Sequence, residues 1–399
     1  MKRRDLLKTG LLAAAVGTLS GCQSEKSVFN KDEIIPKQTD VYQFSVPLPL
    51  NYDTIDELVE INSTLKKSKV ANFYNSIPVP CSNYDQFIQI DRGKNLEIKS
   101  YEQYMGYVDY AQSKGFHYCH LMNSTKALTE NDFNTIKKDM YHTLDLLKEH
   151  KVTEIKITNP QVAKWVYDYN PEFNFSSSTA TGYNSIMQYR NLFEIFPNFK
   201  LIDLCIDQNQ NFSFLKTLRK VYPDIKLELM VNEPCIKGCP ARVSHEGETF
   251  FSIYDCSKPR KRDGAMAAFF KTSAIYPWNL EYYSAIGINN FKFLPEHNNG
   301  LRANFNNLAL LKNYLKLVEN GPGDMTADEF FTSTYSQTTD IHLNKNVKLS
   351  QIIPYFPKIE HFVKYGDRCM TSCGVDCKYC HNCADQMEQA LEVKFTNYS

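Results

Sequence analysis

The sequence predicts an α/β fold, a (β/α)8 barrel of the TIM type that is followed by a cysteine-rich C-terminal extension. The first observation is a rhythm, because short apolar runs alternate with amphipathic segments eight times between residues 40 and 320. Strands that alternate with helices indicate a parallel sheet, and eight such units indicate a closed barrel. The second observation is the length of 399 residues, which suits one large domain with extensions or two domains. Because the individual strands are short, a doubly wound open sheet is the alternative.

Eight apolar runs supply the strands in chain order, and a segment with helical periodicity follows each of them. Thr129 stands three residues before Asp132, which predicts a capping box, and Pro160 suits the first turn of a helix. The expected strands are Val41–Leu48, Val70–Tyr74, Phe116–Leu121, Glu154–Thr158, Phe173–Ser177, Leu201–Ile206, Ile225–Val231 and Asn290–Leu294. The expected helices are Thr54–Lys66, Tyr101–Ser113, one from Thr129 through Leu147, one from Pro160, Asn184–Phe196, Phe212–Tyr222, Leu280–Ala285 and Asn304–Val318.

The N-terminal residues 1–22 have the pattern of an export signal. A basic start with Arg3-Arg4 precedes the apolar stretch Leu11–Leu19, which is too short to span a membrane with ease. The arginine pair resembles a twin-arginine signal, and Leu19–Cys22 resembles a lipoprotein processing box in which Cys22 is lipidated. A plain secretory signal or an uncleaved anchor is the alternative. We therefore expect an exported, membrane-anchored lipoprotein on the periplasmic or extracellular side, with a polar linker at 23–39 before the barrel.

Three cysteines follow the seventh expected strand within a short stretch, Asn232–Cys256. Cys235, Cys239 and Cys256 have the spacing C-x3-C-x16-C, and thiolates at such spacing can converge on one iron–sulfur centre. A loop after a barrel strand lies on the C-terminal face, where TIM barrels carry their chemistry. Buried thiols or a disulfide are the alternatives.

Three polar residues next to these thiols are candidate catalytic residues. Arg242, His245 and Glu246 could bind an anionic substrate or donate hydrogen bonds to cluster sulfurs, and the alternative is ordinary solvated side chains. His245-Glu246 starts like the zinc motif H-E-x-x-H, but Thr249 stands where the second histidine belongs. Cys119 lies between His117 and His120, yet adjacent residues of a strand point to opposite faces, so packing is the favoured role.

The C-terminal extension, residues 321–399, carries the second cysteine cluster. Its five thiols fall within fifteen residues, a density that indicates metal binding. One or more of them could complete the centre that begins at Cys235, or four could bind a separate iron–sulfur cluster or a structural Zn²⁺. The chain is therefore expected to hold one [4Fe-4S] cluster or two, with disulfides as the alternative. The five residues are Cys369, Cys373, Cys377, Cys380 and Cys383.

The middle of the chain, within residues 150–320, resembles peptidase family U32, the collagenase-like proteases. The segments that carry the resemblance are Ser176–Thr179, Tyr183–Ser185, Leu201–Leu204, the helical run from Phe212, Asn232–Cys235, Gly238–Pro240, Pro277–Tyr283 and Ile286–Ile288. The resemblance implies a TIM barrel with a [4Fe-4S] cluster on the cysteines after strand seven. Family members include enzymes of oxygen-independent hydroxylation of RNA bases or quinone precursors, and others are called peptidases.

The chain departs from the family pattern at two places. Pro295-Glu296 follows the last strand where the family commonly has Gly-Arg, so Arg302 would have to replace that arginine. The fourth cysteine of cluster-bearing relatives is absent, so His297 or a C-terminal cysteine would have to supply the ligand.

Three functions follow as hypotheses. The first is an exported U32-like [4Fe-4S] protein with redox or hydroxylase-type chemistry on a small molecule, served by a redox partner. The second is a peptidase or peptide-binding barrel, although the sequence shows no G-x-S-x-G nucleophile motif. The third is a non-catalytic lipoprotein with a zinc- or disulfide-stapled tail. No nucleic-acid partner is expected, because the formal net charge is zero and the signal points outward.

Overall fold

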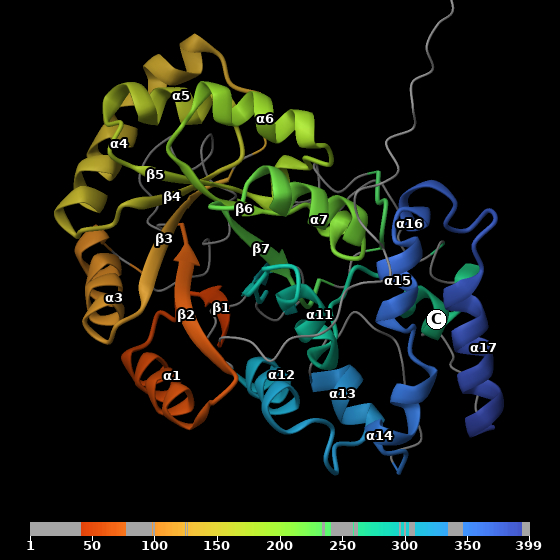
Figure 1. Cartoon of the computed structure of the whole chain (residues 1–399). Coiled ribbons are helices and arrows are strands. Elements are labelled where there is room, and N and C mark those ends of the chain that lie inside the picture. The colour runs from red at the N-terminus through yellow and green to blue at the C-terminus, as the bar shows by residue number, and fades with distance from the viewer. Residues whose placement is uncertain are drawn as a thin grey trace, which may run out of the picture. The chain divides into compact units, whose positions relative to one another are not determined.

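The computed structural model in Figure 1 describes most of the chain from residue 41 to residue 392. The described residues are 41–76, 98, 100–123, 125, 127–233, 236–240, 258, 262–294, 297–298, 301–302, 308–333 and 346–392. They belong to one compact unit that runs from Ile34 to Ser399. The predicted signal and linker lie outside the described residues, and the boundary expected at residue 320 stays a prediction.

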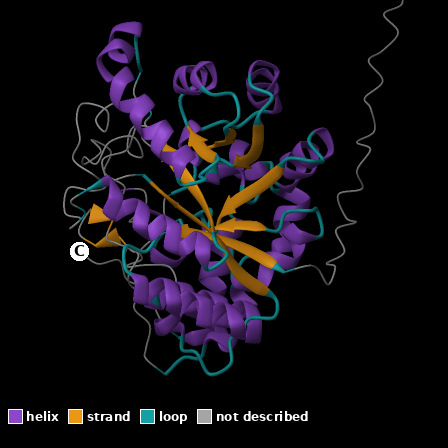
Figure 2. Cartoon of the chain, turned by 90° about the vertical axis from the view of Figure 1, so that its left-hand side faces the viewer, coloured by secondary structure: helices purple, strands orange, loops and turns teal. Residues whose placement is uncertain are grey.

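Eight parallel strands form a closed barrel in sequence order, which confirms the predicted fold. Figure 2 shows these strands inside a surrounding set of helices. The barrel closes where β1 pairs with β8, with Gln43 opposite Asn290 and Ser45 opposite Lys292. The strands are β1 Tyr42–Pro47, β2 Ser68–Asn75, β3 His117–Met122, β4 Glu154–Ile157, β5 Asn174–Ser177, β6 Phe199–Asp203, β7 Lys226–Met230 and β8 Asn290–Lys292.

Apart from α10, which the sequence pattern did not predict, the helices that follow the strands lie close to the expected positions. Thr129 and Asp132 form the predicted capping box of α4, and Pro160 occupies the first turn of α5. The helices of the barrel are α1 Tyr52–Thr64, α3 Tyr101–Ser113, α4 Glu130–Glu149, α5 Pro160–Tyr169, α6 Ile186–Ile195, α7 Phe212–Val221, α10 Ala265–Phe270, α11 Leu280–Ser284 and α12 Ala309–Asn320.

One strand ends earlier than the sequence pattern suggested. β6 ends at Asp203 because the chain then turns into a short 3-10 helix, η2, at Ile206–Gln208. The last helix, α17 Tyr379–Leu391, includes two cysteines of the tail. Cys380 and Cys383 therefore lie on its first turns, one helical turn apart, rather than in the preceding loop.

The C-terminal extension continues the structure with a group of short helices. Figure 1 shows them together, in blue, on the side of the barrel that carries α7 and α11. α15 contacts α7, and α17 contacts α10, so the tail packs onto the βα units after β6 and β7. No helix among the described residues is long and apolar enough to cross a membrane. The helices are α13 Ala327–Ser333, α14 Leu349–Ile352, α15 Ile359–Tyr365, α16 Arg368–Thr371 and α17.

Alternate side chains of each strand divide between two different environments. The outward set, such as Phe44, Phe73 and Phe291, packs with the helices in one large apolar core. The inward set is unusually polar for a TIM barrel, whose interior is ordinarily filled with layers of branched apolar side chains. Lys156, Asp203, Glu228 and Lys292 are all buried there.

Candidate functional site

The segment that follows β7 carries Cys239, the described cysteine of the first cluster. Ile236 forms a β-bridge with Thr272, just after α10. The amide of Gly238 donates to Asp207 Oδ1 at 3.0 Å, and Lys237 Nζ donates to Gln210 Oε1 at 2.5 Å. These bonds fix the segment over η2 and the start of α7. Cys239 is buried at its end.

The tail reaches the same place from the other end of the chain. An ideal Cβ on Gly366 would lie only 2.1 Å from the carbonyl oxygen of Gln210, so the chain before α16 passes directly against the β6–α7 turn. Cys380 Sγ lies 3.5 Å from the carbonyl oxygen of Phe270, in a hydrogen bond that joins α17 to α10. The segment from Ile236 to Gly238 and the tail cysteines Cys369 and Cys373 therefore lie in one region.

Lys237 influences thiols of the tail, which shows how closely the two segments approach. Burial raises the pKa of Cys369, and the positive charge of Lys237 opposes that rise. Burial likewise raises the pKa of Cys380, again opposed by Lys237. The thiols also affect one another, since Cys373 and Cys377 add to the rise at Cys369. Cys369 and Cys380 thus lie near one cation, and thiols are the donors that suit soft metals such as iron in clusters or zinc.

The thiols do not yet stand in a finished coordination geometry. Within the described part of the chain, no three Cys, His, Asp or Glu side chains are arranged to hold a metal ion. Cys373 is exposed, whereas Cys383 is buried on α17. The donor types fit an iron–sulfur centre or zinc, and the ligand assignment stays a prediction.

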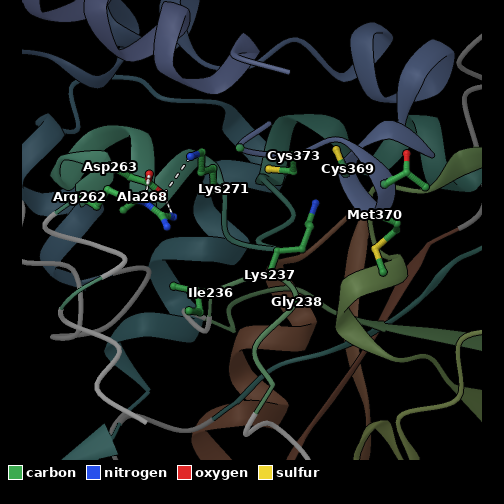
Figure 3. A pocket seen from close by; sticks show the side chains of 12 residues that line it. Ile236, Lys237, Gly238, Arg262, Asp263, Ala268, Lys271, Cys369, Met370 and Cys373 are labelled. Carbon is green, nitrogen blue, oxygen red and sulfur yellow. Dashed lines mark hydrogen bonds and ion pairs between the residues drawn. The ribbon is translucent and has the colours of Figure 1, made fainter. Parts of the chain in front are cut away.

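A pocket of about 320 Å³ opens between the β7 segment and the tail. Figure 3 shows Lys237 pointing towards Cys369 and Cys373, with Lys271, Arg262 and Asp263 across the pocket. Lys271 Nζ lies 2.9 Å from Asp263 Oδ2 and 2.7 Å from His381 Nε2 on α17. Three cations against one carboxylate give the lining an excess of positive charge.

Several predicted site residues lie outside the described residues. These are Cys22, Cys235, Cys256, Arg242, His245 and Glu246, together with Pro295 and Glu296. His297 and Arg302 belong to a two-stranded antiparallel pair, β9 His297–Asn298 and β10 Leu301–Arg302, in which they oppose each other.

Cys119 and its neighbouring histidines do not form a catalytic pair. Cys119 faces the barrel interior, 3.7 Å from Ser176 Oγ, and burial raises the pKa of its thiol to about 12. His120 is fully buried, and burial lowers its pKa to about 3, while His117 is exposed. The packing role expected from strand alternation therefore holds for His120.

The barrel interior holds a second cluster of ionisable groups, which no sequence motif marked. Lys156 Nζ of β4 donates to Asp203 Oδ2 of β6 at 2.6 Å and to Glu228 Oε2 of β7 at 2.8 Å. Lys292 Nζ of β8 donates to the same Asp203 Oδ2 at 2.9 Å. Ser45 Oγ of β1 donates to Glu228 Oε1 at 2.5 Å. These contacts join strands that are not neighbours in the sheet, so they cross the interior.

The two carboxyl groups of this network titrate differently. Burial raises the pKa of Asp203, but the ammonium groups of Lys156 and Lys292 outweigh burial and hold that pKa well below its usual range. Burial raises the pKa of Glu228 to about 7, with Lys156 opposing and Asp203 adding to the rise. Environments that separate two carboxyl pKa values are a mark of acid–base sites.

Comparison with known proteins adds a likeness in fold only. Neither a family model nor a curated protein matches the sequence. A solved U32 peptidase, Mk0906, is 10% identical with a TM-score of 0.40, over 66% of this chain and 96% of that one. An N-acetylneuraminate lyase from Fusobacterium nucleatum is 13% identical with a TM-score of 0.34, over 89% and 99%. A GH18 chitinase from Pseudoalteromonas aurantia is 8% identical with a TM-score of 0.38, over 70% and 99%. At these values the fold assignment rests on the barrel's own strand order.

Proposed function

We propose that the protein is an exported, lipid-anchored, U32-like barrel enzyme with a thiolate-bound iron–sulfur centre, which performs redox or hydroxylase-type chemistry on a small molecule. The observation that carries the proposal is the approach of the tail to the β7 segment. Lys237, two residues before Cys239, affects the pKa of both Cys369 and Cys380. Lys237 and Cys369, more than a hundred residues apart in sequence, line the same pocket, which supports the proposal.

The proposed ligands come from Cys239 and the tail thiols Cys369, Cys373, Cys377 and Cys380, with Cys235 and Cys256 as further candidates. Bound there, an iron–sulfur centre supplies one-electron transfer. Lys237 compensates the negative charge of the thiolates, because its cation lies beside two of them. The fold leaves Cys369, Cys377 and Cys380 half-buried, which limits the access of water.

The pocket beside the thiols is the proposed substrate site. Its cations Lys271 and Arg262 favour an anionic group, because Lys237 offsets the thiolates and Asp263 is the one carboxylate among the lining residues. Lys271 is held between Asp263 and His381, so its position depends on α17 as well as on the barrel. A substrate with a carboxylate or a similar anion would therefore be oriented next to the centre.

The test is a metal analysis of the full chain, recovered from the membrane fraction and purified without oxygen. Iron and sulfide are measured by chemical analysis and the cluster by visible absorbance, for wild type, Cys377→Ala, Cys239→Ala and Cys119→Ser. Cys119→Ser is the matched control, since its buried thiol lies inside the barrel, away from the tail. We expect iron in wild type and in the control.

The variants distinguish one centre from two. If both Cys377→Ala and Cys239→Ala abolish the iron, one centre is shared, and if each removes about half, there are two. Zinc in place of iron would favour the stapled-tail lipoprotein instead. Absence of iron from the anaerobic wild-type protein contradicts the proposal, and recovery only from the soluble fraction contradicts the lipid anchor.

A further inference from the structure

The buried network inside the barrel is placed where a TIM barrel performs chemistry. Asp203 and Lys292 are the last residues of β6 and β8, at the C-terminal ends of their strands. Substrates of this fold bind at that end. All four charged side chains, those of Lys156, Asp203, Glu228 and Lys292, are at least 94% buried. Burial of four ionisable groups is costly, and buried, perturbed ionisable groups cluster at functional sites.

The two lysines of this network are not equivalent. Lys156 donates to both carboxylates, Asp203 and Glu228. Lys292 donates only to Asp203 Oδ2 within the network, and this oxygen also accepts from Lys156. Lys292 Nζ also lies 4.3 Å from the centre of the Tyr74 ring. Lys292 is therefore the less strongly paired ammonium group and the one that loses a proton at lower cost. Burial lowers its pKa, and the charge of Lys156 lowers it further, against the pull of Asp203.

A nearby carboxyl group can take the proton that Lys292 releases. Asp203 Oδ1 is buried and has no hydrogen-bond donor among the described residues. A proton on Glu228 could supply that donor, because both carboxyl groups contact the same Lys156 ammonium group, Asp203 Oδ2 at 2.6 Å and Glu228 Oε2 at 2.8 Å. Moving one proton from Lys292 to Glu228 leaves the total charge of the network unchanged. The same four residues can thus present a neutral amine and a carboxylic acid together.

We propose that Lys292 is a carbonyl-reactive amine that condenses with a small, uncharged aldehyde or ketone, with Glu228 as proton donor and Asp203 as counter-ion of the product. An amine held next to another cation and away from water is an activated nucleophile for imine formation. This activity uses no residue of the cysteine region and does not depend on the proposed iron–sulfur function.

The reaction balances with the groups present. The Nζ lone pair forms the C–N bond, and the carbonyl oxygen takes the Glu228 proton. One Nζ proton then returns to the Glu228 carboxylate. The nitrogen lone pair forms the C=N bond as the hydroxyl group leaves with that proton as water. The product is a protonated imine on Lys292 beside the Asp203 carboxylate, with Glu228 ionised.

The neighbours of Lys292 define the class of carbonyl compound. Met230 pairs with Lys292 in register across the β7–β8 ladder. Met230, Leu294 and Ile206 form an apolar cluster at this end of the barrel, and Tyr74 covers the amine from the side. Apolar surroundings with a charge-balanced network beneath them favour an uncharged substrate over an anionic one.

The test traps the imine by reduction in the intact protein. The full chain is treated briefly with limiting acetaldehyde and sodium cyanoborohydride, and with pyruvate in parallel as an anionic carbonyl compound. Peptide mass spectrometry then gives the extent of alkylation at each lysine. We expect Lys292 to be alkylated by acetaldehyde at least about tenfold faster than exposed Lys164, because a neutral amine reacts and an ammonium group does not. Pyruvate should label Lys292 more slowly.

Two variants keep the result interpretable. Lys292→Arg retains the cation for Asp203 but forms no imine, so its adduct at position 292 should vanish while the fold is retained by circular dichroism. Glu228→Gln removes the proton donor and should slow alkylation at Lys292 without affecting Lys164. The proposal is overturned if Lys292 is labelled no faster than Lys164, or if Glu228→Gln leaves its rate unchanged. Faster labelling by pyruvate would overturn the assignment of an uncharged substrate.

Discussion

Replacing Asp203 by Asn should strongly destabilise the barrel, because Asp203 is the counter-ion of two buried ammonium groups. Its Oδ2 atom accepts from Lys156 at 2.6 Å and from Lys292 at 2.9 Å, and its side chain is fully buried. Removing one partner of a buried ion pair costs about 3–5 kcal/mol of unfolding free energy. The loss cannot greatly exceed the cost of neutralising the unpaired lysine instead. Deprotonating an ordinary lysine at pH 7 costs about 5 kcal/mol. We therefore expect Asp203→Asn to lose about 3–5 kcal/mol at pH 7.

The assay is urea unfolding followed by tryptophan fluorescence and by circular dichroism. The double variant Asp203→Asn with Lys292→Met should recover at least half of the loss, because Lys156 then pairs with Glu228 alone. Raising the pH from 7 to 9 should also reduce the difference in unfolding free energy between Asp203→Asn and wild type, since an unpaired buried lysine becomes neutral more easily at higher pH. Asp168→Asn is the matched control, because its exposed i,i+4 pair with Lys164 contributes less than about 0.5 kcal/mol. A loss at Asp203→Asn no larger than in this control would refute the reasoning.

Two further predictions concern the barrel wall and the docking of the tail. Burial lowers the pKa of His120 to about 3, so protonation of the unfolded chain below pH 6.5 favours unfolding. The unfolding free energy of the wild type should fall by about 2 kcal/mol between pH 7 and pH 5, and that of His120→Gln should not show this fall. If the unfolding free energies of the two proteins depend on pH in the same way, the prediction is contradicted. Gly366→Ala should cost about 1–3 kcal/mol, because its Cβ would meet the Gln210 carbonyl oxygen and displace the tail. Limited proteolysis of the folded variant should then cut the tail faster, and an unchanged cleavage rate would show that the contact is not required.

The sequence by itself determined the barrel. Strand-like runs and helical periodicity are local patterns of apolar residues, so they are visible in the sequence. Eight strand–helix units in a row are typical of a closed (β/α)8 barrel. Caps such as Thr129 with Asp132, and the Pro160 start of α5, are equally local and were predicted correctly. The sequence also marked the two cysteine clusters through spacing, although Cys235 and Cys256 lie outside the described residues.

Only the tertiary structure decided which charges meet. Lys156 lies in the run Glu154–Ile157, which reads as an ordinary strand with a solvated lysine, and its partners Asp203 and Glu228 are 47 and 72 residues away. Alternation shows that such residues share a face, but the face becomes a closed interior only when β8 pairs with β1. A lysine that is solvated on an open sheet then needs a counter-ion, because burial of an unpaired charge is too costly.

The contacts around the cysteines likewise depend on tertiary structure, because they join residues that are far apart in the sequence. Lys271 and His381 contact each other across 110 residues, and Lys237 approaches the tail thiols only because α15 and α17 pack onto α7 and α10. Spacing along the chain predicted that the two clusters bind metal, but it does not indicate where the tail docks on the barrel. That contact depends on the apolar faces of short helices whose partners are distant in sequence. The barrel is thus a property of local pattern, and both candidate sites are properties of closure and docking.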